Sequence, residues 1–187
     1  MNITPRETRV ALVENGSLQE LHIERARKRG LVGNVYKGAV SRVLPGMQAA
    51  FIDAGLERTA FLHASDIARS EAEEGRDRAR VPDINRLLKE QQSVLVQVIK
   101  DPLGSKGARL TTHITVPSRY MVLLPGNPTV GISSRIEDDA ERTRLRELGE
   151  RFVTEAEESA GVILRTAAEG VSDEDLARDV DFLQRLW

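Results

Sequence analysis

Between residues 33 and 116 the sequence breaks into short strand-like runs separated by turn residues. These runs lie at residues 35–43, 49–53, 59–62, 93–100 and 108–116. Several strands of this length at this spacing are typical of a small β-barrel. The middle of the chain is therefore predicted to form such a barrel.

The segments on either side of the barrel have different patterns. Residues 9–13 and 18–24 are predicted to pair as a β-hairpin around an Asn-Gly turn, and alternation in the second strand predicts one buried face. After Pro117 the chain alternates between strands and helices. The strands are expected at 120–124 and 161–166, and the helices at 136–158 and 172–187. The fold class is accordingly α+β.

Two further segments bear on the extent of these units. Residues 68–86 contain five arginines, five acidic residues and almost nothing apolar, which predicts a mobile insertion that ends in a short helix near residues 84–88. The last helix carries an apolar face and stops at Trp187 without a glycine or a polar tail. We therefore expect a piece of a longer protein. The alternative is a compact C-terminus with Trp187 in the core.

Composition excludes several kinds of site. The chain has no cysteine, which rules out disulfides, thiolate metal sites and a cysteine nucleophile within it, and its three histidines are scattered. There is no membrane-spanning apolar run and no secretion signal, so a cytoplasmic location without membrane contact is expected. Net charge is −2, but residues 25–42 hold six basic residues and no acidic one. That stretch is either a patch for a phosphate backbone or a solvated basic turn.

The predicted barrel carries two of the four phenylalanines, Phe51 and Phe61, near the ends of neighbouring strands. Lys37, Lys106 and Arg109 are candidates for the same surface. A barrel of the OB type binds single-stranded nucleic acid by stacking bases on aromatic rings while cations follow the backbone. The alternative is that both rings pack in the barrel core.

Arg165 and Thr166 follow a buried-looking strand. An arginine fork beside a hydroxyl can hold a terminal phosphate through charge-assisted hydrogen bonds. The alternative is an arginine paired with a helix carboxylate. The pattern contains no catalytic constellation, because the acidic clusters near 138 and 173 occupy first turns of predicted helices, where carboxylates complement the dipole. His63 and His113 lack an acidic or nucleophilic partner in the pattern, which favours ordinary structural roles.

Five motifs resemble the ribonuclease E/G family. They are VGNVYKG at 32–38, LPGMQAAFID at 44–53, FLHASDI at 61–67, KDPLGSKGARLTT at 100–112 and ILRTAAEG at 163–170. The resemblance covers nearly the whole chain and is weakest at 68–86. Residues 117–120 and 171–172 are closer to the G branch of that family than to the E branch.

The resemblance implies an RNase H-like subdomain split by an inserted S1-type (OB-fold) β-barrel. Residues 1–34 and 118–187 would form the RNase H-like subdomain, and 35–117 the S1-type domain. The family cleaves single-stranded RNA that carries a 5′-monophosphate, and it processes ribosomal RNA, such as the 16S rRNA 5′ end, and messenger RNA. It is also expected to form homo-oligomers.

Site residues carry over from the family position by position. The arginine, threonine and valine of its 5′-sensor pocket fall on Arg165, Thr166 and Val122, and a glycine of that pocket falls on Ser118. The stacking and basic positions of its barrel fall on Phe51, Phe61 and Lys106. The resemblance further implies that catalytic aspartates with Mg²⁺, and structural cysteines with Zn²⁺, lie beyond residue 187.

The resemblance thus implies the RNA-binding and 5′-sensing part of an Mg²⁺-dependent endoribonuclease, with no cofactor, metal ligand or catalytic residue of its own. This piece is expected to be inactive alone. A non-catalytic RNA-binding or assembly module is the alternative, and a standalone nuclease is a third hypothesis.

Overall fold

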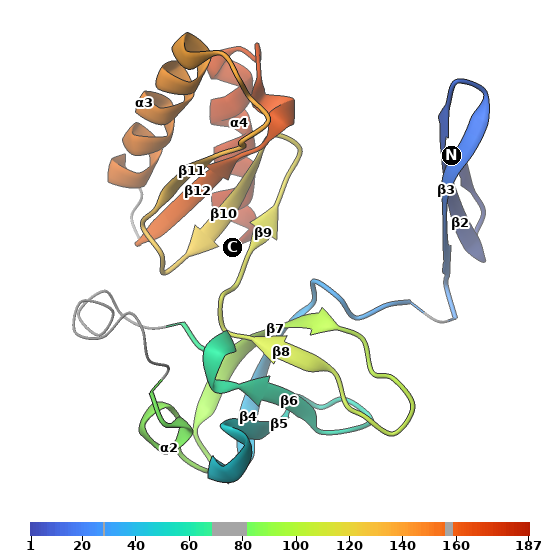
Figure 1. Ribbon diagram of the computed structural model, residues 1–187, viewed down its shortest axis with the longest axis vertical. Coiled ribbons are helices and arrows are strands. Elements are labelled where there is room, and N and C mark those ends of the chain that lie inside the picture. The colour runs from blue at the N-terminus through green and yellow to red at the C-terminus, as the bar shows by residue number, and fades with distance from the viewer. Residues whose placement is uncertain (28, 69–81, 156–158) are drawn as a thin grey trace. The chain divides into compact units, whose positions relative to one another are not determined.

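The computed structural model describes residues 1–27, 29–68, 82–155 and 159–187, and these form two compact units (Figure 1). The first unit runs from Met1 to Ser65 and continues up to Thr111. The second begins with a short segment at Asp66 and comprises mainly Thr112–Trp187. Each unit is described by itself below.

The first unit begins with a three-stranded antiparallel ribbon, which confirms the predicted hairpin. Its strands are β1 (Asn2–Ile3), β2 (Glu7–Glu14) and β3 (Ser17–Arg25). Asn15 and Gly16 have φ angles of 50° and 77°, as a two-residue hairpin turn requires. The predicted buried face was wrong: Leu21 is 54% exposed and Ile23 is 47% exposed. A three-stranded ribbon has no second layer of its own to cover its apolar side chains.

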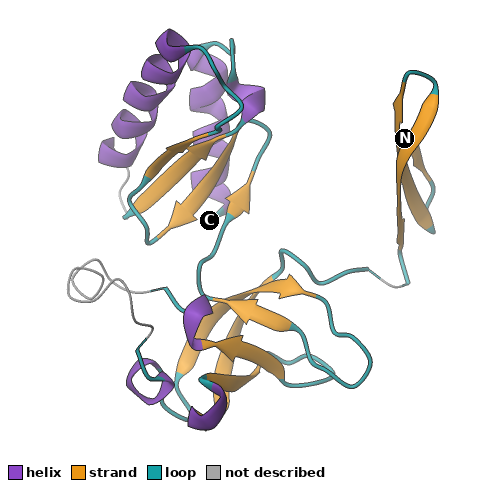
Figure 2. Cartoon of the chain, in the orientation of Figure 1, coloured by secondary structure: helices purple, strands orange, loops and turns teal. Residues whose placement is uncertain are grey.

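The rest of the first unit is a closed five-stranded barrel, as predicted (Figure 2). The strands follow one another around it as β4 (Val35–Leu44), β5 (Ala49–Asp53), β6 (Ala60–His63), β8 (Arg109–Thr111) and β7 (Ser93–Lys100). Short 3₁₀ turns at Pro45–Met47 and Ala64–Asp66 follow β4 and β6. The side chains of Val40, Ile52, Leu62, Val96 and Leu110 are fully buried and fill the barrel.

The short helix α2 (Ile84–Leu87) confirms the helix predicted near residues 84–88. Asp83 caps it, because its carboxylate accepts a hydrogen bond of 2.9 Å from the Asn85 backbone N–H. Most of the predicted mobile insertion, residues 69–81, lies outside the described residues.

The loop between β7 and β8 packs directly on the start of β6. A Cβ at Gly107 would lie 2.0 Å from the Thr59 carbonyl oxygen, so only glycine fits there. This close approach lets the Ala108 carbonyl accept a 2.7 Å hydrogen bond from the Phe61 N–H. The loop therefore fixes the backbone of the strand that carries Phe61.

The second unit is a four-stranded mixed sheet with two long helices (Figure 1). The sheet order is β11 (Val130–Ile132), β12 (Ala160–Leu164), β10 (Met121–Pro125), β9 (Val116–Pro117), and the helices are α3 (Asp139–Glu155) and α4 (Asp173–Leu186). β12 pairs parallel with β11 and antiparallel with β10. This unit confirms the strands and helices predicted after Pro117, although α3 starts at Asp139 rather than near 136.

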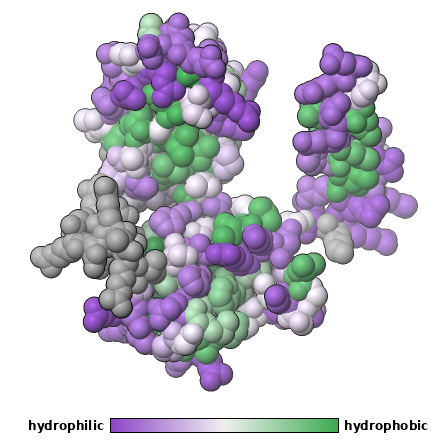
Figure 3. Space-filling view, in the orientation of Figure 1, coloured by the Kyte–Doolittle hydropathy of each residue, from purple (hydrophilic) through white to green (hydrophobic). Residues whose placement is uncertain are grey.

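One face of this sheet carries the core. Met121, Leu123, Val162 and Leu164 are buried in one cluster with apolar residues of both helices, among them Leu145, Leu148, Leu176, Val180 and Leu183. Val122 and Ile163 alternate with these residues and occupy the opposite face, where Ile163 is 38% exposed. Figure 3 shows hydrophobic side chains gathered over the strands of this unit.

The last helix begins after the N-cap residue Ser172 and ends at the exposed residue Trp187. The Ser172 hydroxyl accepts a hydrogen bond of 3.3 Å from the Asp175 N–H. Trp187 is 44% exposed, so the alternative in which it packs in the core was wrong. In the part of the chain that the structure describes, no helix is long and apolar enough to span a bilayer.

Candidate nucleic-acid interface

Phe51 and Phe61 lie on the outer face of the barrel. They are register partners in β5 and β6, and the residues on either side of each are fully buried. Because side chains alternate along a strand, both rings point away from the core, and both are half-buried. Their centroids are 6.4 Å apart with an interplanar angle of 69°. The alternative in which both rings fill the core was therefore wrong.

His63 extends this aromatic surface along β6. Its ring lies nearly parallel to that of Phe61, with centroids 6.5 Å apart and 30° between the planes. The Ser65 hydroxyl lies 2.7 Å from His63 Nδ1, and the Ser65 N–H donates to the same atom at 3.2 Å. These contacts hold the imidazole plane beside Phe61. The sequence pattern gave His63 only a structural role.

Cations continue the line of the two phenylalanines on both sides. Across the barrel the register pairs Arg42 with Phe51, Phe51 with Phe61, Phe61 with Arg109, and Arg109 with Lys100. Register partners on neighbouring strands lie about 5 Å apart, so the path through the five residues is about 20 Å long and follows the curve of the barrel. We call them the aromatic–cationic row. The sequence did not predict that Lys100 or Arg42, the last cation of the basic stretch, belongs to this row, because membership depends on strand register.

Two further predicted cations, Lys37 and Lys106, are exposed on the barrel unit but do not share the register of this row. Lys37 is the register partner of Leu95, and it lies five residues from Arg42 along β4, or about 16 Å. Lys37 is thus not part of the row. Lys106 is exposed in the loop that leads into β8, where its N–H donates to the Leu103 carbonyl at 3.0 Å.

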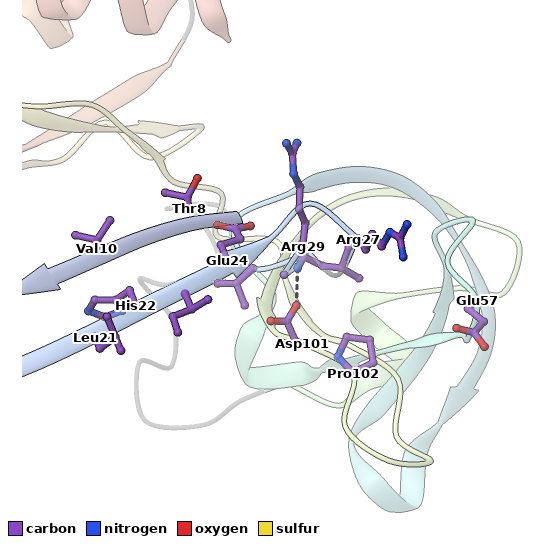
Figure 4. A pocket seen from close by; sticks show the side chains of 14 residues that line it. Thr8, Val10, Leu21, His22, Glu24, Arg27, Arg29, Glu57, Asp101 and Pro102 are labelled. Carbon is purple, nitrogen blue, oxygen red and sulfur yellow. Dashed lines mark hydrogen bonds between the residues drawn. The ribbon is translucent and has the colours of Figure 1, made fainter. Parts of the chain in front are cut away.

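A cavity of about 1020 Å³ lies elsewhere on the first unit (Figure 4). Its lining comes from the ribbon, from residues 29–32 and from the β7–β8 loop, where the Asp101 carboxylate accepts a hydrogen bond from the Leu31 N–H. Arg27 and Arg29, from the basic stretch, belong to this lining. Arg25 is instead paired with Glu7 at 2.9 Å. Among the described residues of the stretch, Arg25 is therefore engaged by a carboxylate, whereas Arg27 and Arg29 line the cavity.

Arg165 lies just after β12 in the second unit. Its N–H donates to the Tyr120 carbonyl at 2.8 Å, and its guanidinium Nη1 donates to the Ser118 carbonyl at 2.6 Å. The guanidinium thus binds a backbone carbonyl, not the helix carboxylate of the alternative reading. A guanidinium has five N–H donors, so this contact leaves donors available for an anion.

Thr166, Val122 and Ser118 gather around Arg165. The Thr166 hydroxyl lies 2.8 Å from the Ser133 hydroxyl, a neighbour that the sequence did not indicate. Val122 pairs with Ile163, two residues before Arg165. The Ser118 hydroxyl donates to the Asp179 carboxylate on α4, while its carbonyl accepts from Arg165. The structure therefore brings all four predicted sensor residues together.

An ion-paired clamp fixes the segment after this cluster. Glu141 accepts hydrogen bonds from Arg144 Nε at 2.8 Å, Arg144 Nη2 at 2.7 Å and the Gly170 N–H at 2.9 Å. Arg144 also donates to the Val171 carbonyl at 3.1 Å and pairs with Asp173. Chiefly through the Arg144 hydrogen bonds, the pKa of Glu141 falls to about 2.

This clamp predicts acid sensitivity of the second unit. A depressed folded-state pKa stabilises the fold above the unfolded pKa near 4.5, and that stability is lost as the pH falls toward about 2. After solvent screening of the partly exposed Arg144, we expect a contribution of about 1–2 kcal/mol. Urea unfolding followed by Trp187 fluorescence should show wild type losing more than half of this increment between pH 6 and pH 3. Glu141→Gln should lack the increment at both pH values; an equal pH dependence in both proteins would contradict the role of the clamp.

The described ranges, 1–27, 29–68, 82–155 and 159–187, contain no group of three or more histidine, aspartate or glutamate residues arranged to hold a metal ion.

Comparison with known proteins gives matches for both units. Residues 31–111 match the S1 RNA binding domain, and residues 115–187 match the Ribonuclease E/G family. Over the whole chain the sequence is 56% identical to ribonuclease G of Haemophilus influenzae, of which it spans 38%. Over 97% of the chain it is 42% identical to ribonuclease E of Escherichia coli, of which it spans 17%. The higher identity to ribonuclease G agrees with the closeness to the G branch.

Among solved structures, the solution structure of GSP13 from Bacillus subtilis aligns with 43% of this chain and 54% of its own. Its identity is 26% and its TM-score is 0.32, so the fold assignment does not depend on it. The two matches follow one another along the sequence, and ribonuclease G of Haemophilus influenzae aligns with all of this chain. The chain therefore belongs to the ribonuclease E/G family and carries an S1 RNA-binding domain at residues 31–111.

Proposed function

We propose that this chain is the RNA-binding and 5′-monophosphate-sensing part of a single-strand-specific endoribonuclease. The observation that supports this most directly is the aromatic–cationic row on the outer face of an S1 domain. Two half-buried rings on a barrel surface, continued by cations on both sides, offer stacking platforms for bases and counter-charges for the backbone. Because every base has a π-face, such a row binds single strands with little sequence preference.

The cluster around Arg165 supplies the proposed selectivity for the RNA end. A phosphate monoester carries about −1.5 to −2 charges near neutral pH, whereas a 5′-hydroxyl is uncharged. The guanidinium would donate two parallel hydrogen bonds to the phosphate, and the Thr166 hydroxyl would donate a third. Val122 lies beside this position on the same face of the sheet, as a wall for the first nucleotide.

The remaining family properties are proposed for the longer protein to which this sequence corresponds. There, residues 1–34 and 118–187 would form the RNase H-like subdomain around the S1 insert at 35–117. The residues that would hold a catalytic Mg²⁺, which would supply the chemistry of cleavage, and a structural Zn²⁺ would belong to other parts of that longer protein. The sensor would then accelerate cleavage by positioning RNA, since it contributes no chemistry. Processing of ribosomal and messenger RNA, homo-oligomer formation and a cytoplasmic location are proposed on the same basis.

A non-catalytic RNA-binding or assembly module is the second candidate, because the aromatic–cationic row would suffice for it. The two functions differ in whether the 5′ end matters.

Single-strand recognition, which both functions require, is tested by titrating this chain with a single-stranded RNA of about ten nucleotides and with the corresponding duplex at several salt concentrations. Tighter binding of the single strand, weakening with salt, is expected. Equal binding of both forms would contradict single-strand recognition, and cleavage by this chain with Mg²⁺ would favour a standalone nuclease.

A further inference from the structure

Asp179 on α4 is bound to the turn that leads from β9 to β10. One of its oxygens, Oδ2, accepts both the Ser118 hydroxyl and the Tyr120 N–H, the latter at 3.1 Å. The carboxylate is half-buried, and its two partners belong to the segment between the strands. Hydrogen bonds to a charged group are stronger than neutral ones, so Asp179 restrains this turn.

The same turn holds Arg165 at two points. The Ser118 carbonyl accepts from the guanidinium at 2.6 Å, and the Tyr120 carbonyl accepts from the Arg165 N–H at 2.8 Å. A second hydrogen bond, from the Ser118 N–H to the Met121 carbonyl at 2.8 Å, ties the start of the turn to β10. The direction of the guanidinium therefore depends on a carbonyl whose position Asp179 stabilises.

The connection also accounts for Ser118, where the family resemblance places a glycine. A hydroxyl next to a phosphate site could compete for the guanidinium or block the pocket. Here the hydroxyl is engaged with Asp179, and a 2.9 Å contact joins it to the Met121 carbonyl. The serine thus belongs to the support of the site rather than to its phosphate-binding surface.

We propose that Asp179 is a positioning residue: it fixes the turn at residues 118–120 so that the Arg165 guanidinium is preorganised for a 5′-monophosphate. This inference rests on the proposed function of Arg165. The negative charge of Asp179 has the wrong sign for direct phosphate binding, so any contribution of Asp179 to phosphate affinity must come from geometry. Preorganisation matters because a misdirected guanidinium loses its bidentate fit to the phosphate.

Two substitutions at Asp179 separate geometry from charge. Asp179→Ala removes the acceptor of both hydrogen bonds, and we expect it to reduce a monophosphate preference of about tenfold to about threefold while leaving affinity for 5′-hydroxyl RNA unchanged. Asp179→Asn retains one oxygen, which can accept both bonds, and it should keep most of the preference. Asp181→Ala, an exposed carboxylate on the same helix, is the matched control and should change neither affinity.

The assay measures the affinity of this chain for one short RNA with either end, at fixed salt, with thermal unfolding recorded for each variant. Equal losses in Asp179→Ala and Asp179→Asn would overturn the geometric role, as would a preference unchanged in Asp179→Ala but abolished in Arg165→Ala. If Asp179→Ala does not fold, Ser118→Ala replaces it, because it removes one of the two bonds; an unchanged preference there would overturn the proposal. Absence of any preference in wild type would instead refute the proposed sensor.

Discussion

Replacing Phe61 with alanine should weaken binding of single-stranded RNA by about 5- to 150-fold, whatever the chemistry of the 5′ end. The range corresponds to the loss of one base stacked on an aromatic ring. Phe61 is central to the aromatic–cationic row, because Phe51 and Arg109 are its register partners and the His63 ring stacks beside it at an angle of 30°. Fluorescence anisotropy of a labelled oligonucleotide at fixed salt measures the effect directly.

The chain offers a matched control for this substitution. Phe182 on α4 is an exposed phenylalanine of the second unit and does not belong to the barrel, so Phe182→Ala should leave affinity unchanged. Because the Phe61 ring is only half-buried, its truncation should cost less stability than truncation of a core residue. An unchanged RNA affinity in folded Phe61→Ala would contradict the stacking role, as would a loss explained entirely by unfolding.

Replacing Arg165 with alanine should abolish the preference for a 5′-monophosphate and leave binding of 5′-hydroxyl RNA close to wild type. The guanidinium is the strongest anion-binding group of the cluster, and its removal leaves Thr166 as a neutral donor. Arg165→Lys should retain only part of the preference, because an ammonium keeps the charge without the planar fork. The ratio of affinities for the two RNA ends is the quantity to measure.

Arg185 provides the control for the loss of one positive charge. It is an exposed arginine on α4, in the same unit, whose Nε donates to the Asp181 carbonyl at 3.2 Å. Arg185→Ala should weaken both RNA ends slightly and equally. A preference retained in Arg165→Ala would contradict the sensor assignment. If both affinities also fell by the same factor, Arg165 would have only a general electrostatic role.

Much of the fold could be predicted because local signals agreed with it. The Asn-Gly turn fixed the hairpin, and short strands between turn residues indicated the barrel. The location of Phe51 could not be predicted, since the run Ala49-Ala50-Phe51-Ile52 is apolar on both faces of its strand. Only closure of the barrel buries Ile52 and leaves the ring outside.

The strand β11 (Val130–Ile132) was missed for a related reason. It has three residues with glycine in the middle, so its own propensity is weak. It exists because it pairs in parallel with β12, thirty residues further along the chain, a contact that no local window contains.

The candidate site was predicted only where residue types were distinctive. Arg165 and Thr166 stood out as a pair, whereas Arg42, Lys100, Ser133 and Asp179 are common residue types in unremarkable surroundings. Strand register brings the first two to the phenylalanines, and tertiary hydrogen bonds bring the others to the sensor cluster. Neither kind of contact leaves a periodic signal in the sequence.

The most direct test of the central claim compares one short single-stranded RNA with a 5′-monophosphate or a 5′-hydroxyl, bound to this chain at fixed moderate salt. Salt must be fixed because backbone affinity falls steeply with ionic strength. We predict tighter binding of the monophosphate by about tenfold, equivalent to about 1.4 kcal/mol. Equal affinities for the two ends would contradict the sensor and leave an RNA-binding barrel as the function of this chain.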